Sequence, residues 1–321
     1  MSDHPQLSQA DLHRWLTASG DAQQELFRRA RAVRRETLGD EVMLRGVIEI
    51  SNYCQKRCDY CAMRAPSKIV DRYRLKPAQI LEVVGELKRH RITTAFLQAG
   101  QDPRCDELLE EVIPVIKWGL GMHVLLCLGE RPRHVYQRFA ELGADSYILK
   151  FETSDPQLYQ AVVHAPPERR LQCIRWIQEA GLKLGTGNIV GLPGQTLQSL
   201  VADIEFALEL EPNFVSSAPL IPNEGTPFEH APVGDLDLTL NTMALWRILL
   251  RAPLIPAVSA LEKFGALAMH DVHFPTTDGR ELVFARYTQP EPEQELLLAQ
   301  LGLRLPAQSP PRITAKREVD L

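Results

Sequence analysis

Short apolar runs alternate with amphipathic stretches along most of the chain. The runs have the length of buried strands, and they predict strands at 44–51, 94–98, 123–128, 146–151, 184–190, 214–218 and 255–259. The stretches between them carry apolar residues every three or four positions, and they predict helices at 77–90, 106–119, 133–142, 168–180, 197–210 and 238–250. This alternation is typical of a parallel sheet. Its length favours an α/β fold of the (β/α) TIM-type barrel kind, full or partial.

The two ends of the chain have different patterns. Apolar positions at helical spacing before residue 44 predict two helices that lead into the first strand. The last stretch is rich in Pro, Glu and Arg, and we expect a short helix at 292–301 followed by a loose tail. The predicted organisation is a helical lead-in over residues 1–43, a barrel over 44–288, and a C-terminal helix and tail over 289–321.

The amino-acid composition mainly indicates which partners the protein does not have. Of the 321 residues, 45% are hydrophobic and 24% are charged, which is ordinary for a globular protein. The net charge of −5 gives no basic surface that would indicate a nucleic-acid partner. No apolar run has the length of a membrane span, and the N-terminus lacks a basic region followed by an apolar core. We therefore expect a cytoplasmic protein that binds neither nucleic acid nor a membrane.

The strongest chemical signal is the stretch EISNYCQKRCDYCAMR. It contains three of the six cysteines, Cys54, Cys58 and Cys61, in the spacing Cys-x3-Cys-x2-Cys. In a reducing compartment, clustered cysteines bind metals or act in catalysis more often than they form disulfides. The cysteines directly follow the first predicted strand, and active sites of TIM-type barrels lie at the C-terminal ends of their strands. The position therefore indicates a functional site.

The number of cysteines narrows the kind of metal site. A structural zinc site needs four ligands, usually supplied as two pairs, and no second pair follows in this chain. Three thiolates on one loop suit a cubane iron–sulfur cluster in which one iron has no protein ligand and remains open to another molecule. A zinc site completed by a distant His or Cys is the alternative, and a coincidental group of buried cysteines is a further one.

This motif, with the aromatic Tyr60 before its last cysteine, resembles the signature of the radical S-adenosylmethionine (SAM) superfamily. The resemblance implies a [4Fe–4S] cluster whose open iron binds SAM. It also implies that one electron cleaves SAM to methionine and a 5′-deoxyadenosyl radical, which abstracts hydrogen from a small or carrier-protein-bound substrate. Flavodoxin or ferredoxin is the electron donor that such chemistry implies.

Other segments resemble the SAM-binding parts of this superfamily. LQAGQDP stands where many members have Gly-Gly-Glu, KFETSDP carries an acidic residue, PERRLQCI carries an arginine, and GNIVGLPGQT follows the pattern of the adenine-binding strand. A single Glu or Arg near a helix start is also commonly a capping or surface residue, and VGLPGQT is also compatible with a plain strand–helix turn. The implied cofactor contacts are Tyr60, Gln98, Ala99, Gly100, Glu152, Arg170, Asn188, Val190 and Leu192.

Longer phrases resemble one branch of the superfamily, the maturase of the [FeFe]-hydrogenase cofactor, which is related to biotin synthase and methylornithine synthase. These phrases include RGVIEISNYCQKRCDYCAMR, LGERPR and VGLPGQT, and the resemblance covers roughly residues 30–260. It implies a maturase-like lyase acting on an amino-acid-derived thioether or a similar molecule. Sulfur insertion of the biotin or lipoyl type is the first alternative, and an amino-acid carbon-skeleton mutase is the second. A non-catalytic iron–sulfur or zinc protein would be a different class.

The chain departs from this branch where substrate is expected to bind. Ser146 and Lys150 stand where the branch has two arginines that grip a carboxylate, and Phe151 replaces a His. After the seventh strand the chain reads ALEKFGALAMHDVHFPTTDGRELVFARYTQP, so the last barrel unit is expected to be shortened or rebuilt. The candidate substrate contacts are Ser146, Lys150, Cys127, Asn223 and Ser259, and no catalytic residue is assigned.

The remaining cysteines bear on sulfur insertion, which uses a second iron–sulfur cluster. Cys105 and Cys127 end or follow strands, so both are candidates to face the barrel mouth, whereas Cys173 lies in a helical pattern and is predicted to be core. Two cysteines are too few for an all-thiolate cluster, and buried inert thiols are common. A second iron–sulfur cluster is therefore kept only as part of the sulfur-insertion alternative. His270 and His273 lack a third ligand, which favours a substrate-facing or surface role.

Overall fold

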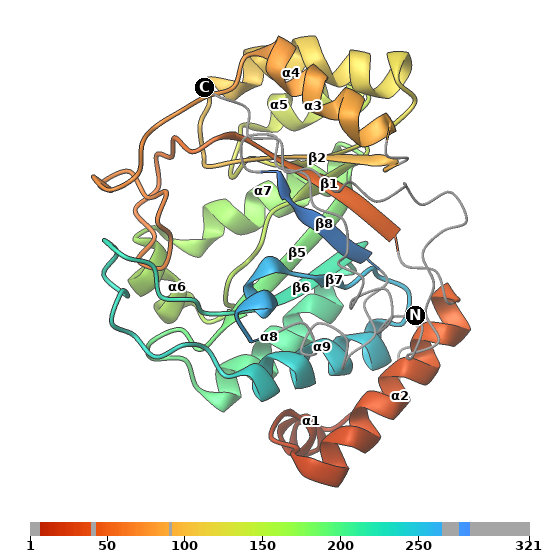
Figure 1. The fold of residues 1–321 in the computed structure, drawn as a ribbon. Helices are drawn as coiled ribbons and strands as arrows, with labels where there is room; N and C mark the ends of the chain where they lie inside the picture. The colour runs from red at the N-terminus through yellow and green to blue at the C-terminus, as the bar shows by residue number, and fades with distance from the viewer. Residues whose placement is uncertain (1–6, 40–42, 90–91, 265–275, 283–321) are drawn as a thin grey trace.

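Eight parallel strands form one sheet in the computed structural model, which describes residues 7–39, 43–89, 92–264 and 276–282 (Figure 1). The strands are β1 (Met43–Ser51), β2 (Thr94–Ala99), β3 (His123–Cys127), β4 (Ser146–Ile148), β5 (Lys183–Val190), β6 (Phe214–Pro219), β7 (Pro256–Ala257) and β8 (Thr276–Leu282). Their order in the sheet is β6-β5-β4-β3-β2-β1-β8-β7. The predicted helix at 292–301, the tail after it, and His270 and His273 lie outside the described residues.

The first and last strands of this order meet, so the sheet curls into a barrel (Figure 1). A parallel bridge joins Phe214, at the start of β6, to Leu254, two residues before β7. The Leu254 N–H donates to the Asn213 carbonyl at 2.9 Å, and the Leu254 carbonyl accepts from the Val215 N–H at 3.0 Å. These contacts confirm the predicted α/β fold with a TIM-type barrel.

The last barrel unit differs from the predicted elements. The run at 255–259 forms a strand only over Pro256–Ala257, and Ser259 begins a 3-10 helix, Ser259–Phe264. β8 lies in a segment where the apolar pattern predicts no strand, and it pairs in parallel with both β1 and β7. The polar sequence TTDGREL lacks the apolar run by which the other strands are recognised.

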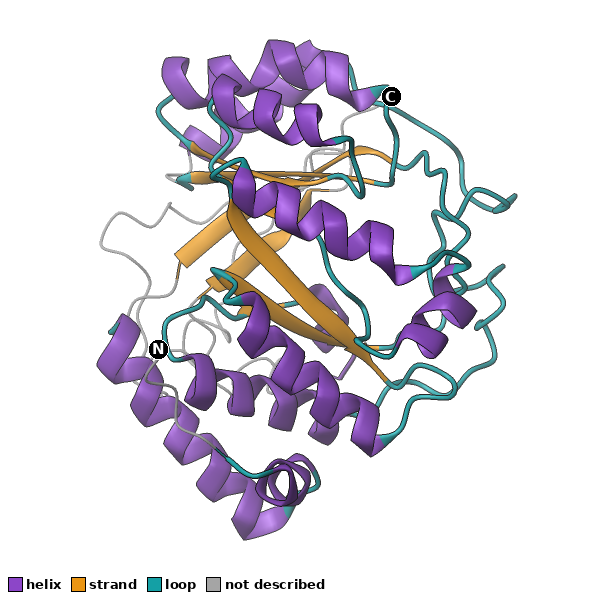
Figure 2. Cartoon of the chain, turned by 180° about the vertical axis from the view of Figure 1, so that it is seen from behind, coloured by secondary structure: helices purple, strands orange, loops and turns teal. Residues whose placement is uncertain are grey.

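Helices cover the outside of the barrel (Figures 1 and 2). The helices α1 and α2 pack outside α8 and α9, as an N-terminal lead-in beside the barrel (Figure 1). A π-helical turn, Val115–Gly119, directly continues α4 after its last residue, Pro114. The helices are α1 (Gln9–Leu16), α2 (Gly20–Leu38), α3 (Pro77–Arg89), α4 (Cys105–Pro114), α5 (Arg133–Leu142), α6 (Pro156–Val163), α7 (Pro167–Glu179), α8 (Leu197–Leu210) and α9 (Leu236–Leu250).

The apolar pattern did not predict α6, although its start is encoded locally. The Asp155 carboxylate accepts hydrogen bonds from the N–H groups of Gln157 and Leu158, and Pro156 occupies the first turn. An aspartate at the N-cap followed by proline is a strong helix start, because it satisfies exposed N–H groups and presets the backbone. None of the described helices is long and apolar enough to cross a membrane.

Alternation along the strands separates two apolar layers. Residues such as Ile48, Leu97 and Leu126 belong to the large core between sheet and helices, whereas Val47, Phe96 and Leu125 form a separate cluster. Because successive strand residues point to opposite faces, the second cluster lies inside the barrel. Cys127 and Ile148 pack against this interior cluster. The interior below the C-terminal strand ends therefore holds an apolar cluster, with the buried Arg45 guanidinium over the Phe96 ring at 5.1 Å.

Candidate functional site

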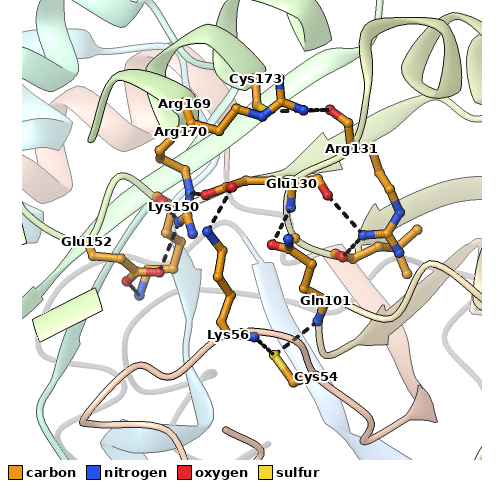
Figure 3. A network of polar contacts seen from close by, with 12 residues as sticks. Cys54, Lys56, Gln101, Glu130, Arg131, Lys150, Glu152, Arg169, Arg170 and Cys173 are labelled. Atoms are coloured by element: carbon orange, nitrogen blue, oxygen red, sulfur yellow. Dashed lines mark hydrogen bonds and ion pairs between the residues drawn. The ribbon is translucent and has the colours of Figure 1, made fainter. Parts of the chain in front are cut away.

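The cysteine loop leaves the C-terminal end of β1 and is held against the end of β2 (Figure 3). The Cys54 sulfur accepts hydrogen bonds from two backbone N–H groups, those of Lys56 at 3.4 Å and Gln101 at 3.3 Å. The Gln55 N–H donates to the Gln101 carbonyl at 3.0 Å. Donors aimed at a ligand sulfur stabilise its negative charge and tune a bound metal group.

The second half of the loop is anchored to α6. The Asp59 carboxylate contacts the His164 Nε2 at 2.7 Å and the Arg64 guanidinium at 3.2 Å. The Asp59 N–H also donates to the Val162 carbonyl at 2.9 Å, and the Cys58 side chain packs in the apolar cluster that includes Val162. Cys58 is therefore nearly buried, although the loop that carries it is polar in sequence.

A further anchor comes from the segment after β6. The side-chain amide of Asn223 donates to the carbonyls of Tyr60 and Ile221, each at 3.0 Å. The structure thus places this substrate candidate against the backbone of the cysteine loop. A substrate contact by Asn223 stays a prediction.

The protonation of the cysteines depends on whether a metal is bound. Burial raises the pKa of Cys58 to about 11 and that of Cys61 to about 12, so without a metal both side chains are neutral thiols. Coordination removes thiol protons, because the metal charge compensates for the desolvated sulfur. Among the described residues, no three His, Cys, Asp or Glu side chains are grouped for one metal ion. A cluster does not need such a group, because its thiolates are distributed over several irons.

Arg170 is fixed by Glu130, which follows β3 (Figure 3). The two side chains are 7% and 5% exposed, and the Arg170 Nε donates to a Glu130 oxygen at 2.9 Å. The other Glu130 oxygen accepts from the Lys56 ammonium at 2.9 Å. Burial alone would raise the pKa of the Glu130 carboxyl, but the charges of Arg170 and Lys56 outweigh it, so this pKa lies below its ordinary value. The carboxylate therefore stays ionised between two cations.

Glu152 has an unusual backbone at the same site. Its φ of 66° is in the left-handed region, which costs a non-glycine residue about 1–3 kcal/mol. The conformation is maintained by hydrogen bonds from the Glu152 N–H to Gly187 and from the Ile189 N–H to Glu152. A Glu152 oxygen lies 3.6 Å from an Arg170 nitrogen, and the other lies 4.0 Å from the Lys150 ammonium. Strain at a half-buried charged residue is an observation that supports a functional role.

The fifth-strand segment contributes mainly backbone and apolar surface. The Asn188 side chain is buried, donates to Asp203 on α8 at 2.9 Å and accepts from Ser217 at 2.8 Å. Its amide therefore points away from the barrel interior. The Val190 carbonyl accepts from the Leu220 N–H, and Leu192 packs in the same cluster as Cys58. Cofactor contacts by Asn188, Val190 and Leu192 stay predictions.

The end of β2 contributes a polar row inside the barrel. Glu49, Gln98 and Cys127 are paired in register across β1, β2 and β3. The Gln98 amide donates to the Glu49 carboxylate at 2.6 Å, so its side chain is engaged within the row. Ala99 is buried in the outer core, and Gly100 adjoins the cysteine loop. Burial raises the pKa of the Cys127 thiol to about 12, so it is neutral.

The structure brings only some substrate candidates to this interior. Lys150 and Cys127 lie near Glu152 at the C-terminal strand ends. Ser146 is the first residue of β4 and so lies at the N-terminal end of the strand, away from the barrel mouth. Ser259 is exposed and lies two residues after the end of β7. The substrate roles of both residues stay predictions.

Cys105 and Cys173 lie away from the cysteine loop and from the barrel interior. Cys105 is fully buried in the outer core beside Asp102, and its pKa is raised to about 12 by burial and then by that carboxylate. Cys173 is buried on α7, as predicted, and donates to the Arg131 carbonyl. Cys105 therefore does not reach the barrel mouth, and of the two alternatives the structure supports the buried, inert thiol.

Sequence reasoning missed four residues of the site, namely Glu49, Lys56, Gln101 and Glu130. Two signals for them were available. Glu49 is a carboxylate within the apolar run at 47–50 of the first strand, and Glu130 lies in the phrase LGERPR, to which no role was given. Lys56 and Gln101 lie next to predicted ligands and contacts, but only their contacts with Cys54 and Glu130 reveal their part.

Comparison with known proteins identifies the family. Residues 48–207 match the model of the radical SAM superfamily. The [FeFe] hydrogenase maturase subunit HydE of Thermotoga maritima is 40% identical over 238 residues, which are 74% of this chain and 68% of that protein. The chain belongs to the radical SAM superfamily. The suspected resemblance is thereby confirmed, and the protein is a radical SAM enzyme with relatives among hydrogenase maturases.

Two further relatives bear on the fold and on the alternatives. The 3-methylornithine synthase of Methanosarcina acetivorans is 29% identical over 262 residues, covering 80% of this chain and 74% of that protein. The crystal structure of a methylornithine synthase superposes with a TM-score of 0.84 at 22% identity and covers 95% of each chain, which shows a common fold. Membership of this superfamily implies a [4Fe–4S] cluster, SAM, an electron donor and a substrate.

The residues at the barrel mouth fit these groups. Three cysteines on one loop provide the thiolates, and two N–H groups already point at the Cys54 sulfur. Arg170 and Glu152 provide one cation and one anion beside the loop. The Tyr159 hydroxyl is buried in the cluster that contains Cys58 and has no hydrogen-bond partner among the described residues. Polar groups of a cofactor would be compatible with this set.

Proposed function

We propose that Cys54, Cys58 and Cys61 hold a [4Fe–4S] cluster and that SAM binds between this loop and the Arg170–Glu152 pair. When bound, these groups supply one-electron cleavage of SAM and a 5′-deoxyadenosyl radical that abstracts hydrogen from a substrate. The observation that carries the proposal is the continuous set of contacts from Cys54 through Lys56 and Glu130 to Arg170 (Figure 3). It links the three-cysteine loop to the predicted SAM-binding side chains.

Arg170 would bind the carboxylate of the methionine part of SAM. A guanidinium suits a carboxylate because its planar donors match two oxygens. Its Nε is held by Glu130 and one terminal nitrogen donates to the Lys150 carbonyl, so the plane has a fixed direction. Glu152 would accept from a ribose hydroxyl or the amino group. Backbone groups of 98–100 and 187–192 would provide the remaining contacts, with the ring of Tyr60 beside the cluster.

The reaction that we propose is a hydrogen-atom abstraction of the hydrogenase-maturase type, from a small or carrier-bound substrate inside the barrel. The similarity to the maturase HydE supports this choice. A carbon-skeleton mutase is the second candidate, supported by the similarity to 3-methylornithine synthase. Lys150 and Cys127 are the substrate contacts that the geometry favours. Sulfur insertion has less support, because Cys105 is buried away from the mouth.

A flavodoxin or ferredoxin would supply the electron. None of the six cysteines forms a disulfide, which suits the reducing conditions of a cytoplasm. We therefore assign the enzyme to that compartment.

Anaerobic reconstitution with iron and sulfide, followed by reduction in the presence of SAM, tests the proposal. We expect 5′-deoxyadenosine from the wild-type protein and none from Cys54→Ser, whereas Cys173→Ala should retain the activity because Cys173 lies in the core. One bound zinc per chain, together with no 5′-deoxyadenosine from wild type in the presence of candidate substrates, would overturn it.

A further inference from the structure

We propose that Glu130 is a positioning residue, which orients Arg170 toward the SAM carboxylate and ties that arginine to the cysteine loop. The inference rests on the proposed function and extends it to a residue outside the cysteine motif and the predicted SAM contacts. Its basis is the double contact of one buried carboxylate with cations from two different parts of the site, Lys56 and Arg170.

The backbone of Glu130 is fixed as firmly as its side chain. Its N–H donates to the Gln101 side-chain oxygen at 3.0 Å, and its carbonyl accepts from the Arg131 guanidinium at 3.1 Å. The Gln101 N–H is itself one of the two donors to the Cys54 sulfur. Arg131 is buried and also donates to the carbonyls of Leu128 and Asp102. Glu130 is therefore held by groups that also hold the ends of β2 and β3.

The side-chain contacts transmit this position to both sides of the site. One Glu130 oxygen accepts a hydrogen bond from the Arg170 Nε. This bond fixes one side of the guanidinium and thereby sets the direction in which its terminal nitrogens point. The other oxygen holds the Lys56 ammonium, and the Lys56 N–H contacts the Cys54 sulfur. A shift of Glu130 would consequently move Arg170 and the loop together.

The local ion pairs of Arg170 explain why a second carboxylate would bind beside Glu130. Arg170 is buried, and its Nε lies 2.9 Å from a Glu130 oxygen, whereas its other carboxylate neighbour, Glu152, lies 3.6 Å away. Glu130 also pairs with Lys56, so its negative charge is shared between two cations. A buried cation is unfavourable unless it is paired. Glu130 thus only partly neutralises Arg170, which can accept the carboxylate of SAM as a further partner.

Two substitutions separate the functions of Glu130. Glu130→Gln keeps an oxygen that can accept from the Arg170 Nε, but its amide nitrogen faces the Lys56 ammonium as a second donor. Glu130→Ala removes both contacts. We expect the SAM dissociation constant to rise about ten- to a hundredfold in Glu130→Ala, as for loss of a charge-assisted hydrogen bond, and less in Glu130→Gln. Glu110→Ala is the matched control, because Glu110 pairs with Arg138 on the surface.

The measurement is equilibrium binding of SAM to the anaerobically reconstituted proteins, together with iron content and the thermal midpoint. The same substitution is made in an Arg170→Ala background. If Glu130 acts through Arg170, Glu130→Ala has no further effect on SAM affinity there. An equal loss in both backgrounds, or wild-type affinity in Glu130→Ala, would overturn the inference. Failure of the wild-type protein to form 5′-deoxyadenosine would instead count against the proposed function.

Discussion

The backbone of Gly100 touches Cys54 so closely that no side chain fits between them. A Cβ at position 100 would lie 2.8 Å from the Cys54 Cβ and 2.3 Å from the Tyr53 carbonyl oxygen. The Gly100 N–H also donates to the Ser51 carbonyl at 3.2 Å, so the ends of β1 and β2 are joined here. The first cysteine of the motif is therefore positioned by a glycine that directly follows the neighbouring strand, β2.

Gly100→Ala should displace the cysteine loop and weaken cluster binding. The added methyl group meets backbone atoms that cannot rotate away, and such overpacking typically costs about 1–3 kcal/mol. We expect reconstituted Gly100→Ala to hold clearly less iron than wild type while its circular dichroism spectrum is retained.

The matched control is Gly85→Ala on α3, where the new Cβ has only an Arg89 side-chain atom at 3.7 Å. This substitution should leave the iron content unchanged and slightly raise stability, because alanine favours a helix. Full iron content in Gly100→Ala would show that the loop does not depend on this contact.

The Asn223 amide provides a second test of the loop. In Asn223→Asp a carboxylate would face the carbonyls of Tyr60 and Ile221, and two hydrogen bonds would be replaced by repulsion. The loss of such bonds costs about 1–3 kcal/mol, so iron should be released faster to a chelator. Asn223→Ala should be intermediate, because it removes the donor without adding charge.

Gln160→Glu makes the same amide-to-carboxylate change at an exposed position of α6 and serves as the control. If it and Asn223→Asp lose iron at equal rates, the effect is one of general charge. Asn223 would then not be an anchor of the loop.

The fold was largely predictable because each strand carries its own local pattern. Seven strands were expected, and every one has a counterpart in the barrel, with the mouth correctly placed at the cysteine loop. The side of β5 on which the Asn188 side chain lies was predictable too. Successive strand residues point to opposite faces, so Asn188 shares the outer face with Val190 and not with its neighbours Gly187 and Ile189. β8 was not predictable, because its polar residues form a strand only by pairing with β1 and β7.

The ion pairs of the site could not be predicted from local sequence patterns. Glu130 is 74 residues from Lys56 and 40 residues from Arg170 in sequence, and only the barrel brings the three charges together. A carboxylate in a loop after a strand is ordinarily a surface residue. Its role follows from burial and from its two partners, which become known only when the strands are placed side by side.

The iron content of cysteine variants distinguishes one cluster from two. Cys105 is buried beside Asp102, and Cys127 packs on the interior apolar cluster without other cysteines. We expect Cys105→Ser and Cys127→Ser to keep the roughly four irons of one [4Fe–4S] cluster after reconstitution. If wild type binds clearly more iron and Cys127→Ser loses the excess, a second cluster exists. Sulfur insertion then becomes the preferred reaction.

Asp203 should make stability depend on pH. It is fully buried on α8, and it accepts from the Ser154 N–H and hydroxyl as well as from Asn188, which joins the segment after Glu152 to β5. Burial raises its pKa from 3.8 to about 6. Between these values the folded carboxyl keeps a proton that the unfolded chain has lost. The stabilisation is therefore complete below about pH 4 and is lost as the pH rises to about 6.

Thermal unfolding of the apoprotein and of Asp203→Asn at each pH measures this effect. The amide does not titrate, so the stability of wild type relative to the variant should fall by at most about 3 kcal/mol between pH 4 and 6. Above pH 7 the difference should be constant. Asp102→Asn should show a pH dependence of stability with the opposite sign. Burial raises the pKa of Asp102, but hydrogen bonds from Ser51 and Arg74 outweigh it and lower this pKa, so wild type should lose stability relative to Asp102→Asn as the pH falls. A pH-independent difference between wild type and Asp203→Asn would show that Asp203 is ionised in the folded protein throughout this range.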